Sequence, residues 1–134
     1  MLKVVTRKFG GVAILGLQGR VVNGGTDELS EAIRSQSNAN VLVLDLAQVE
    51  LIDAKGLGVL LELREFAQSR GIEFRLMNVN RLVQQVLELT RLDSVFETAD
   101  EEEIRAAARG QPGRTLAWRA DEPANPIKLN DRTR

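Results

Sequence analysis

Two carboxylates, Glu50 and Asp53, stand beside a glycine-flanked turn in the stretch ELIDAKGLGVLL, residues 50–61. Paired carboxylates can perform acid and base catalysis when both face one reacting atom. These two lie close together on an extended segment, and Glu50 is expected to face away from the turn. No nucleophile or cofactor motif accompanies them. An enzyme that uses this pair is therefore the weakest of the functional hypotheses.

Asp53 stands where an apolar strand is expected to end and a helix to begin. The first backbone N–H groups of a helix have no partner within the helix, and they lie at its positive end. A carboxylate at this junction caps the helix. The exposed turn is suited to an anion or to a loop of a partner protein. We expect this junction to be the functional site.

The chain of 134 residues contains neither His nor Cys. Their absence excludes thiol redox chemistry, Cys and His zinc sites, and histidine bases. No phosphate-binding glycine motif is present, so we expect no catalytic residue, metal or cofactor. The net charge of −1 does not indicate the basic surface that is typical of nucleic-acid binding. No apolar stretch approaches the length of a membrane span, which predicts a cytoplasmic protein without membrane insertion.

Alternating strand-like and helix-like stretches predict an α/β fold. The expected strands cover residues 2–6, 12–17, 41–46, 72–77 and 95–96, and the expected helices lie near residues 26–33, 55–70, 82–87 and 104–109. The order ββαβαβαβα favours one mixed β-sheet with helices packed against it. The first two strands are expected to form a hairpin, and the later ones to be mostly parallel.

Several residues have the chemistry that begins or ends a helix. The candidates are Thr26, Asn78 or Asn80 as N-caps, Gly71 as a helix end, and Asp100 with Glu103 as a pair that resembles a capping box.

The helix expected near residues 55–70 carries two apolar stripes. One contains Val59, Leu60, Leu63, Phe66 and Ala67, and it is expected to face the sheet. Leu57 and Leu61 lie nearly opposite, together with Arg64 and Gln68. We expect these two leucines to be exposed beside the Asp53 turn, as in a protein-binding patch. The alternative is that a neighbouring helix or the C-terminal residues cover them.

Residues 110–134 differ in composition from the rest and hold all three prolines of the chain. No periodic apolar pattern could bury surface there. We expect residues 1–109 to form the domain and residues 110–134 to be a flexible tail. Leu116 and Trp118 leave open a docking peptide or a cover for an apolar patch.

The stretch from Val49 to Leu61 resembles the signature of the STAS domain, the fold of bacterial anti-sigma factor antagonists. The similarity lies in the apolar strand, Asp53, a small residue, a polar residue and Gly56-Leu57-Gly58-Val59-Leu60. The segment from Leu87 to Phe96 and the position of Gly19 are also similar to the family. The resemblance extends over about residues 2–108.

The resemblance implies a partner-switching module that binds an anti-sigma factor, often a kinase with a histidine-kinase-like ATPase fold, and thereby frees a sigma factor. In such families the Ser or Thr after the motif's Asp is phosphorylated, and the added charge dissociates the complex. Here that residue is Ala54, a degenerate phosphorylation position. The acidic residue that family members frequently carry after Gly19 is also missing, because Arg20-Val21-Val22-Asn23 follows. Phosphorylation at another Ser or Thr stays open.

We therefore expect an anti-sigma factor antagonist that works without phosphorylation at position 54. The expected partner-binding residues are Asp53, Ala54, Lys55, Gly56, Leu57, Gly58, Leu61 and Arg64. The alternative is a non-catalytic STAS scaffold subunit of a signalling or lipid-transport ATPase complex. Dimerisation, for example through an edge strand, stays open.

Overall fold

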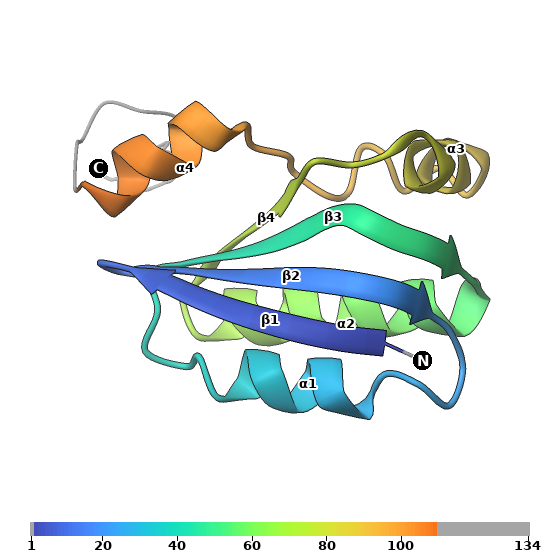
Figure 1. The fold of residues 1–134 in the computed structure, drawn as a ribbon, viewed down its shortest axis with the longest axis horizontal. Coiled ribbons are helices and arrows are strands. Elements are labelled where there is room, and N and C mark those ends of the chain that lie inside the picture. The colour runs from blue at the N-terminus through green and yellow to red at the C-terminus, as the bar shows by residue number, and fades with distance from the viewer. Residues whose placement is uncertain (1, 110–134) are drawn as a thin grey trace. The chain divides into compact units, whose positions relative to one another are not determined.

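The computed structural model of the chain describes residues 2–109. Its elements are β1 (Leu2–Phe9), β2 (Val12–Val21), α1 (Asp27–Arg34), β3 (Val41–Ile52), α2 (Ala54–Ser69), β4 (Glu73–Met77), α3 (Arg81–Leu89) and α4 (Glu101–Ala108) (Figure 1). Residues up to Thr98 fall in one compact unit, and Ala99 begins a second one that contains α4. The tail expected at residues 110–134 lies outside the described residues.

The strands form one mixed sheet in the order β1-β2-β3-β4. β1 and β2 are an antiparallel hairpin, whereas β2, β3 and β4 are parallel neighbours. This confirms the predicted α/β fold with an N-terminal hairpin. Parallel strands need a crossover, and α1 and α2 supply the two crossovers.

Helices α1 and α2 run along one side of the sheet, below the strands in Figure 1. Leu15, Leu44 and Leu76 are register partners on neighbouring strands, so their side chains point to the same side of the sheet. All three are fully buried, and so are Leu29 of α1 and Leu60 of α2. The main core therefore lies between this face and the two helices.

Helix α3 lies above β3 in Figure 1, away from α1 and α2. Of the two predicted alternatives, Asn80 is its cap: the side-chain oxygen accepts a hydrogen bond from Val83 N at 2.9 Å. The amide nitrogen of Asn80 donates to the carbonyls of Leu46 and Val49 in β3, at 3.1 and 2.9 Å. One side chain thus begins α3 and fixes its start against β3.

The strand predicted at Val95–Phe96 is wrong, and the described residues contain four strands. The chain turns at this point, with Val95 N donating to Leu92 O at 3.0 Å. The Phe96 ring is buried in the core, 6.4 Å from that of Phe74 between centroids. Pairing with β4 is limited to an isolated bridge between Leu76 and Thr98.

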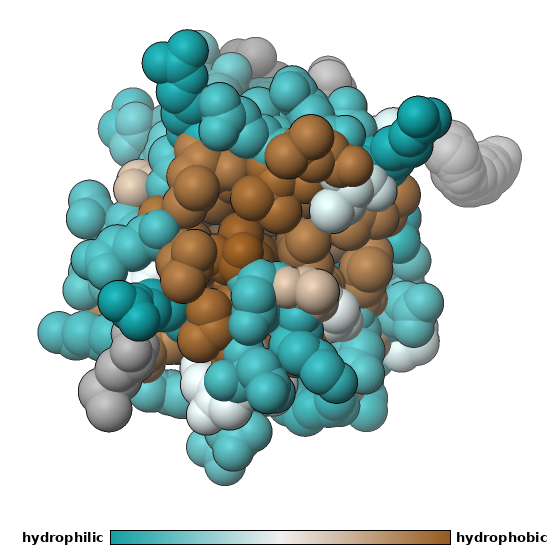
Figure 2. All heavy atoms as spheres, turned by 90° about the vertical axis from the view of Figure 1, so that its right-hand side faces the viewer, coloured by the Kyte–Doolittle hydropathy of each residue, from teal (hydrophilic) through white to brown (hydrophobic). Residues whose placement is uncertain are grey.

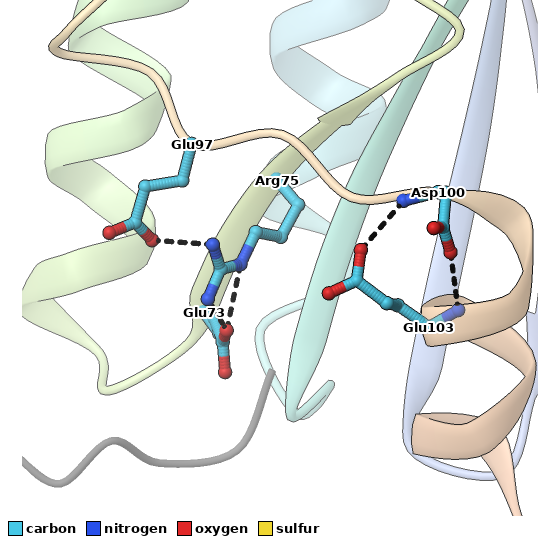
Figure 3. Close-up of polar contacts among 5 residues, drawn as sticks. All are labelled: Glu73, Arg75, Glu97, Asp100 and Glu103. Atoms are coloured by element: carbon cyan, nitrogen blue, oxygen red, sulfur yellow. Dashed lines mark hydrogen bonds and ion pairs between the residues drawn. The ribbon is translucent and has the colours of Figure 1, made fainter. Parts of the chain in front are cut away.

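Arg75 holds the segment after that turn against β4 (Figure 3). Its guanidinium donates to Glu73 through Nε at 2.8 Å and pairs with Glu97 at 2.9 Å. Leu76 N also donates to the carbonyl of Glu97 at 2.8 Å. The arginine is almost fully buried, and its charge is balanced by these carboxylates.

Helix α4 begins with the predicted capping box, which Figure 3 also shows. The Asp100 side chain accepts from Glu103 N at 2.8 Å, and the Glu103 side chain accepts from Asp100 N at 3.0 Å. Two N–H groups that the helix leaves unpaired are thereby satisfied. At α1 the outcome differs, because Thr26 precedes the helix without a side-chain capping bond.

Helix α2 approaches the sheet most closely at Gly56. A Cβ at this position would lie 1.9 Å from the carbonyl oxygen of Val21, the last residue of β2. Gly58 differs, because nothing lies within 4 Å of the Cβ it lacks. The sequence left open whether these glycines serve a partner or the packing of the helix. At Gly56, packing alone demands glycine.

These two glycines make a matched pair of tests. Gly56→Ala is expected to destabilise the protein by about 1–3 kcal/mol or more, since its methyl group meets backbone that cannot move aside easily. Gly58→Ala is expected to stabilise it by about 0.5–1 kcal/mol, because alanine is the better helix former. Urea unfolding followed by far-ultraviolet circular dichroism measures both. Equal effects of the two substitutions would contradict this account of the close approach.

Candidate functional site

Asp53 joins three segments at the end of β3. Its Oδ1 accepts a hydrogen bond from Gly56 N in the first turn of α2, at 2.8 Å. Its Oδ2 accepts from Asn23 N, in the loop after β2, at 3.1 Å. Its own N–H donates to the carbonyl of Val21 at 3.3 Å. The loop after β2 and the start of α2 are therefore fixed side by side.

These hydrogen bonds define the electrostatics of the site. The N–H of Gly56, and after it that of Asn23, stabilises the charged carboxylate and lowers the pKa of Asp53 below its ordinary value. The positive end of α2 acts in the same direction. Both carboxylate oxygens already have partners, so Asp53 shapes the turn more than it offers a charge to another molecule.

The exposed part of the turn consists of small residues and one cation. Ala54, Lys55 and Gly58 are exposed on the first turn of α2, and Asn23 is exposed in the adjoining loop. Ala54 directly follows the carboxylate, and its methyl group can neither donate nor accept a hydrogen bond. Ala54 therefore has no oxygen that could accept a phosphoryl group.

The expectation that Leu57 is exposed is wrong. Leu57 is only 5% exposed and belongs to the core cluster, and Leu61 and Arg64 are half-buried. The close approach at Gly56 rotates the buried face of α2 toward Gly56, Leu57, Leu60, Leu63 and Ala67. Of the eight expected site residues, Gly56 and Leu57 thus serve packing.

The same rotation of α2 leaves Phe66 partly exposed. The sequence pattern places Phe66 in the buried stripe, but in the structure it is only half-buried. The guanidinium groups of Arg34 and Arg70 lie over its ring, 4.9 and 4.7 Å from the centroid. Cations over an aromatic face can replace burial for a ring at the edge of a core.

The sequence analysis missed an apolar area on the face where β2 and β3 end and α2 begins. Figure 2 shows hydrophobic residues gathered on that face. Leu51 in β3 is 44% exposed, and α3 adds Leu82 at 36% and Leu89 at 84%. The composition of α3 indicated this area, because the short helix has more large apolar residues than one contact with the sheet can bury. These residues are Leu82, Val83, Val86, Leu87 and Leu89.

Two other functional signals are absent from residues 2–109. Within that range no three His, Cys, Asp or Glu side chains are grouped as metal ligands would be. None of the helices described is long and apolar enough to cross a membrane.

Comparison with protein families decides what this fold and turn represent. Residues 3–104 match the model of the STAS domain. The chain belongs to the STAS-domain family. The family expected from the Asp53 motif is therefore confirmed.

Relatives of this STAS domain include BtrV of Bordetella bronchiseptica, whose name describes it as an anti-sigma factor antagonist. It is 31% identical over 110 residues, covering 80% of this chain and 94% of BtrV. The solved structure of a Thermotoga maritima protein described in the same way aligns with a TM-score of 0.69 at 24% identity, over 79% of this chain and 94% of that one.

A further structure, the phosphorylated form of the Bacillus cell fate determinant SpoIIAA, aligns with a TM-score of 0.60 at 15% identity. The alignment covers 81% of this chain and all of SpoIIAA, 100%. At such identities the two solved structures show the shared fold.

The hydrogen bonds of Asp53 predict a pH-dependent contribution to stability. A carboxyl group with a lowered pKa stabilises the folded state at pH values above its ordinary pKa, and loses this effect as the pH falls through the lowered one. Asp53→Asn keeps a cap but cannot accept from Asn23 N. We expect it to be less stable than the wild type near neutral pH.

Urea midpoints at about pH 7 and at about pH 3 measure this difference. The gap between the two proteins should narrow at acid pH, where the wild-type carboxyl group also becomes neutral. A gap that stays constant would contradict the assigned role of the charge. Asp93→Asn is the control, because Asp93 is an exposed carboxylate in a turn far along the chain.

Proposed function

We propose that this STAS domain is an anti-sigma factor antagonist. It binds an anti-sigma factor with a histidine-kinase-like ATPase fold and so regulates transcription that depends on a sigma factor. The names of its relatives support the type of partner. The observation that carries the proposal is the Asp53 turn, whose exposed residues are held in place by bonds to both neighbouring segments.

The binding surface that we propose is centred on Ala54, Lys55 and Gly58, with Asn23 beside them. Asp53 and Gly56 hold these residues in place, Asp53 by its hydrogen bond to Gly56 N and Gly56 by its close approach to Val21. Leu61 and Arg64, both half-buried, lie at its edge on α2. The surface contains one cation and no uncompensated carboxylate, so recognition depends mainly on shape and backbone contacts.

The domain works without a phosphate switch at position 54. Alanine has no oxygen that could accept a phosphoryl group. Asp53 already places a negative charge beside this residue, where a phosphate would add a charge of about −1.5 to −2. Without that added charge, no modification at position 54 dissociates the complex. The domain is therefore constitutively able to bind its partner.

The remaining parts of the proposal concern the whole chain. It acts by binding and not as an enzyme, and it works in the cytoplasm. Residues 1–109 carry the activity.

The absence of a hydroxyl at position 54 also suits a second function, that of a scaffold subunit in a signalling or lipid-transport ATPase complex. The two functions differ in what accompanies the tagged chain during purification. A kinase-like anti-sigma factor supports the antagonist, whereas an ATP-binding cassette subunit supports the scaffold.

A negative charge at position 54 is expected to weaken partner binding and leave the fold intact. Ala54→Asp adds an acidic residue to the first turn of α2, where the helix dipole favours it. In the complex the same carboxylate would lose its water against the partner, and we expect at least about a tenfold loss of affinity. Isothermal titration with the anti-sigma factor recovered by pull-down measures this loss.

The matched control is Gln68→Glu. It adds the same charge to α2, about 20 Å further along the helix. It should bind like the wild type. Unchanged affinity of Ala54→Asp, or an equal loss in both variants, would contradict the proposed surface.

A second prediction concerns the phosphate itself. Incubation with ATP and the kinase-like partner should leave the wild type unmodified, whereas Ala54→Ser should gain a phosphate. Intact-mass and peptide mass spectrometry distinguish the two outcomes. Stoichiometric phosphate on the wild type, at any residue, would show that the chain is switched after all.

A further inference from the structure

Helix α3 presents an apolar stripe that the described residues cover only in part. Leu82, Val86 and Leu89 follow one another at intervals of four and three residues, which places them on one side of the helix. Leu89 is 84% exposed, Leu82 is 36% exposed, and Val86 is half-buried. Val83 and Leu87 are buried on the neighbouring side of the helix, and Val86, between the two sides, packs partly against the core. We call Leu82, Val86 and Leu89 the α3 stripe.

Such a stripe is unusual on a helix that is only nine residues long. Singly exposed leucines are normal on protein surfaces, but adjoining ones in one row mark a contact surface. Figure 2 shows that the apolar area continues on the face where the strands end. Among the large apolar side chains of the described residues, Leu89 of the α3 stripe is the most exposed.

The polar residues beside the stripe favour one occupant. Arg81 lies at the start of α3 and Glu88 near its end, and both are exposed. If two α3 helices pack antiparallel, Leu82 of one meets Leu89 of the other. Arg81 of each copy then approaches Glu88 of the other, twice by symmetry. The antiparallel helix dipoles also attract one another.

The other surface through which two copies could pair is the free edge of β1. It is poorly suited to this pairing. β1 carries Lys3, Arg7 and Lys8 and no acidic residue. Pairing of two such edges would place like charges beside one another in a new sheet. Lysine and arginine on an edge strand typically prevent such pairing.

We propose that a second copy of this chain covers the α3 stripe, in an antiparallel α3–α3 homodimer. The contact is small, because each copy contributes one short helix. Interfaces of this size belong to transient complexes. The dimer is therefore weak, and its population rises with protein concentration. This inference does not depend on the proposed function, because the chain alone forms the contact.

Sedimentation velocity on the full chain, from about 1 µM to about 1 mM, tests the proposal. The wild type should shift from monomer toward dimer across this range. Leu89→Asp should raise the dissociation constant at least about tenfold, since it places a charge in the centre of the contact. Val5→Asp is the control: Val5 is 40% exposed in β1, and its substitution should change nothing. A wild type that is monomeric throughout overturns the proposal.

Charge reversal tests the antiparallel arrangement. Arg81→Glu and Glu88→Arg should each weaken the dimer, and the double variant should restore it. Circular dichroism checks that α3 is intact, because Glu88 also accepts a hydrogen bond from Gln84 at 2.9 Å. A double variant no better than the weaker single one overturns this arrangement.

Two further results would assign the stripe to another occupant and overturn the dimer. One is that Leu89→Asp leaves sedimentation unchanged but weakens binding of the anti-sigma factor. The other is that Leu89→Asp shifts the emission of Trp118, the only tryptophan, in dilute monomeric protein. In that case residues 110–134 of the same chain cover the stripe.

Discussion

The close approach of α2 to the end of β2 is the constraint on which the site depends. The backbone of Gly56 lies against the carbonyl of Val21, at a distance that excludes any side chain. The same Gly56 donates its N–H to Asp53, and Asp53 in turn holds Asn23. One glycine and one carboxylate thus determine where three segments meet. The rotation of α2, the burial of Leu57 and the exposure of Ala54 all follow from this contact.

This arrangement separates the residues that build the turn from those that a partner can touch. Asp53 is the most conspicuous residue of the motif, but its oxygens are engaged by backbone N–H groups. What remains accessible is a small, nearly neutral surface on a rigid base. A surface of this kind discriminates partners by fit, because any side chain added to it stands in the way. The exposed residue at position 54 is also where the family resemblance puts its switch.

The sequence predicted most of the fold, because the strong apolar periods and capping residues act locally. The hairpin, the helix end at Gly71 and the capping box of Asp100 were identifiable in this way, whereas Asn78 and Asn80 stayed alternatives for the start of α3. The strand at Val95–Phe96 was not, since Phe96 looks the same in a strand as in a turn that points its ring into the core. The exposure of Leu57 was misjudged for a similar reason. Helical periodicity defines a stripe to within one residue, whereas a contact between distant backbones decides which edge of that stripe is buried.

The salt bridge of Arg75 with Glu97 has a consequence for how the molecule behaves in concentrated solution. It fixes the segment that bridges Leu76 with Thr98 along β4, so this open edge of the sheet is shielded. The opposite edge, β1, is protected by its cations. With both edges blocked, the sheet cannot grow by adding strands, which is the route to fibrils. The aliphatic start of β3, Val41-Leu42-Val43-Leu44, is therefore tolerated at the centre of the sheet without a route to fibrils.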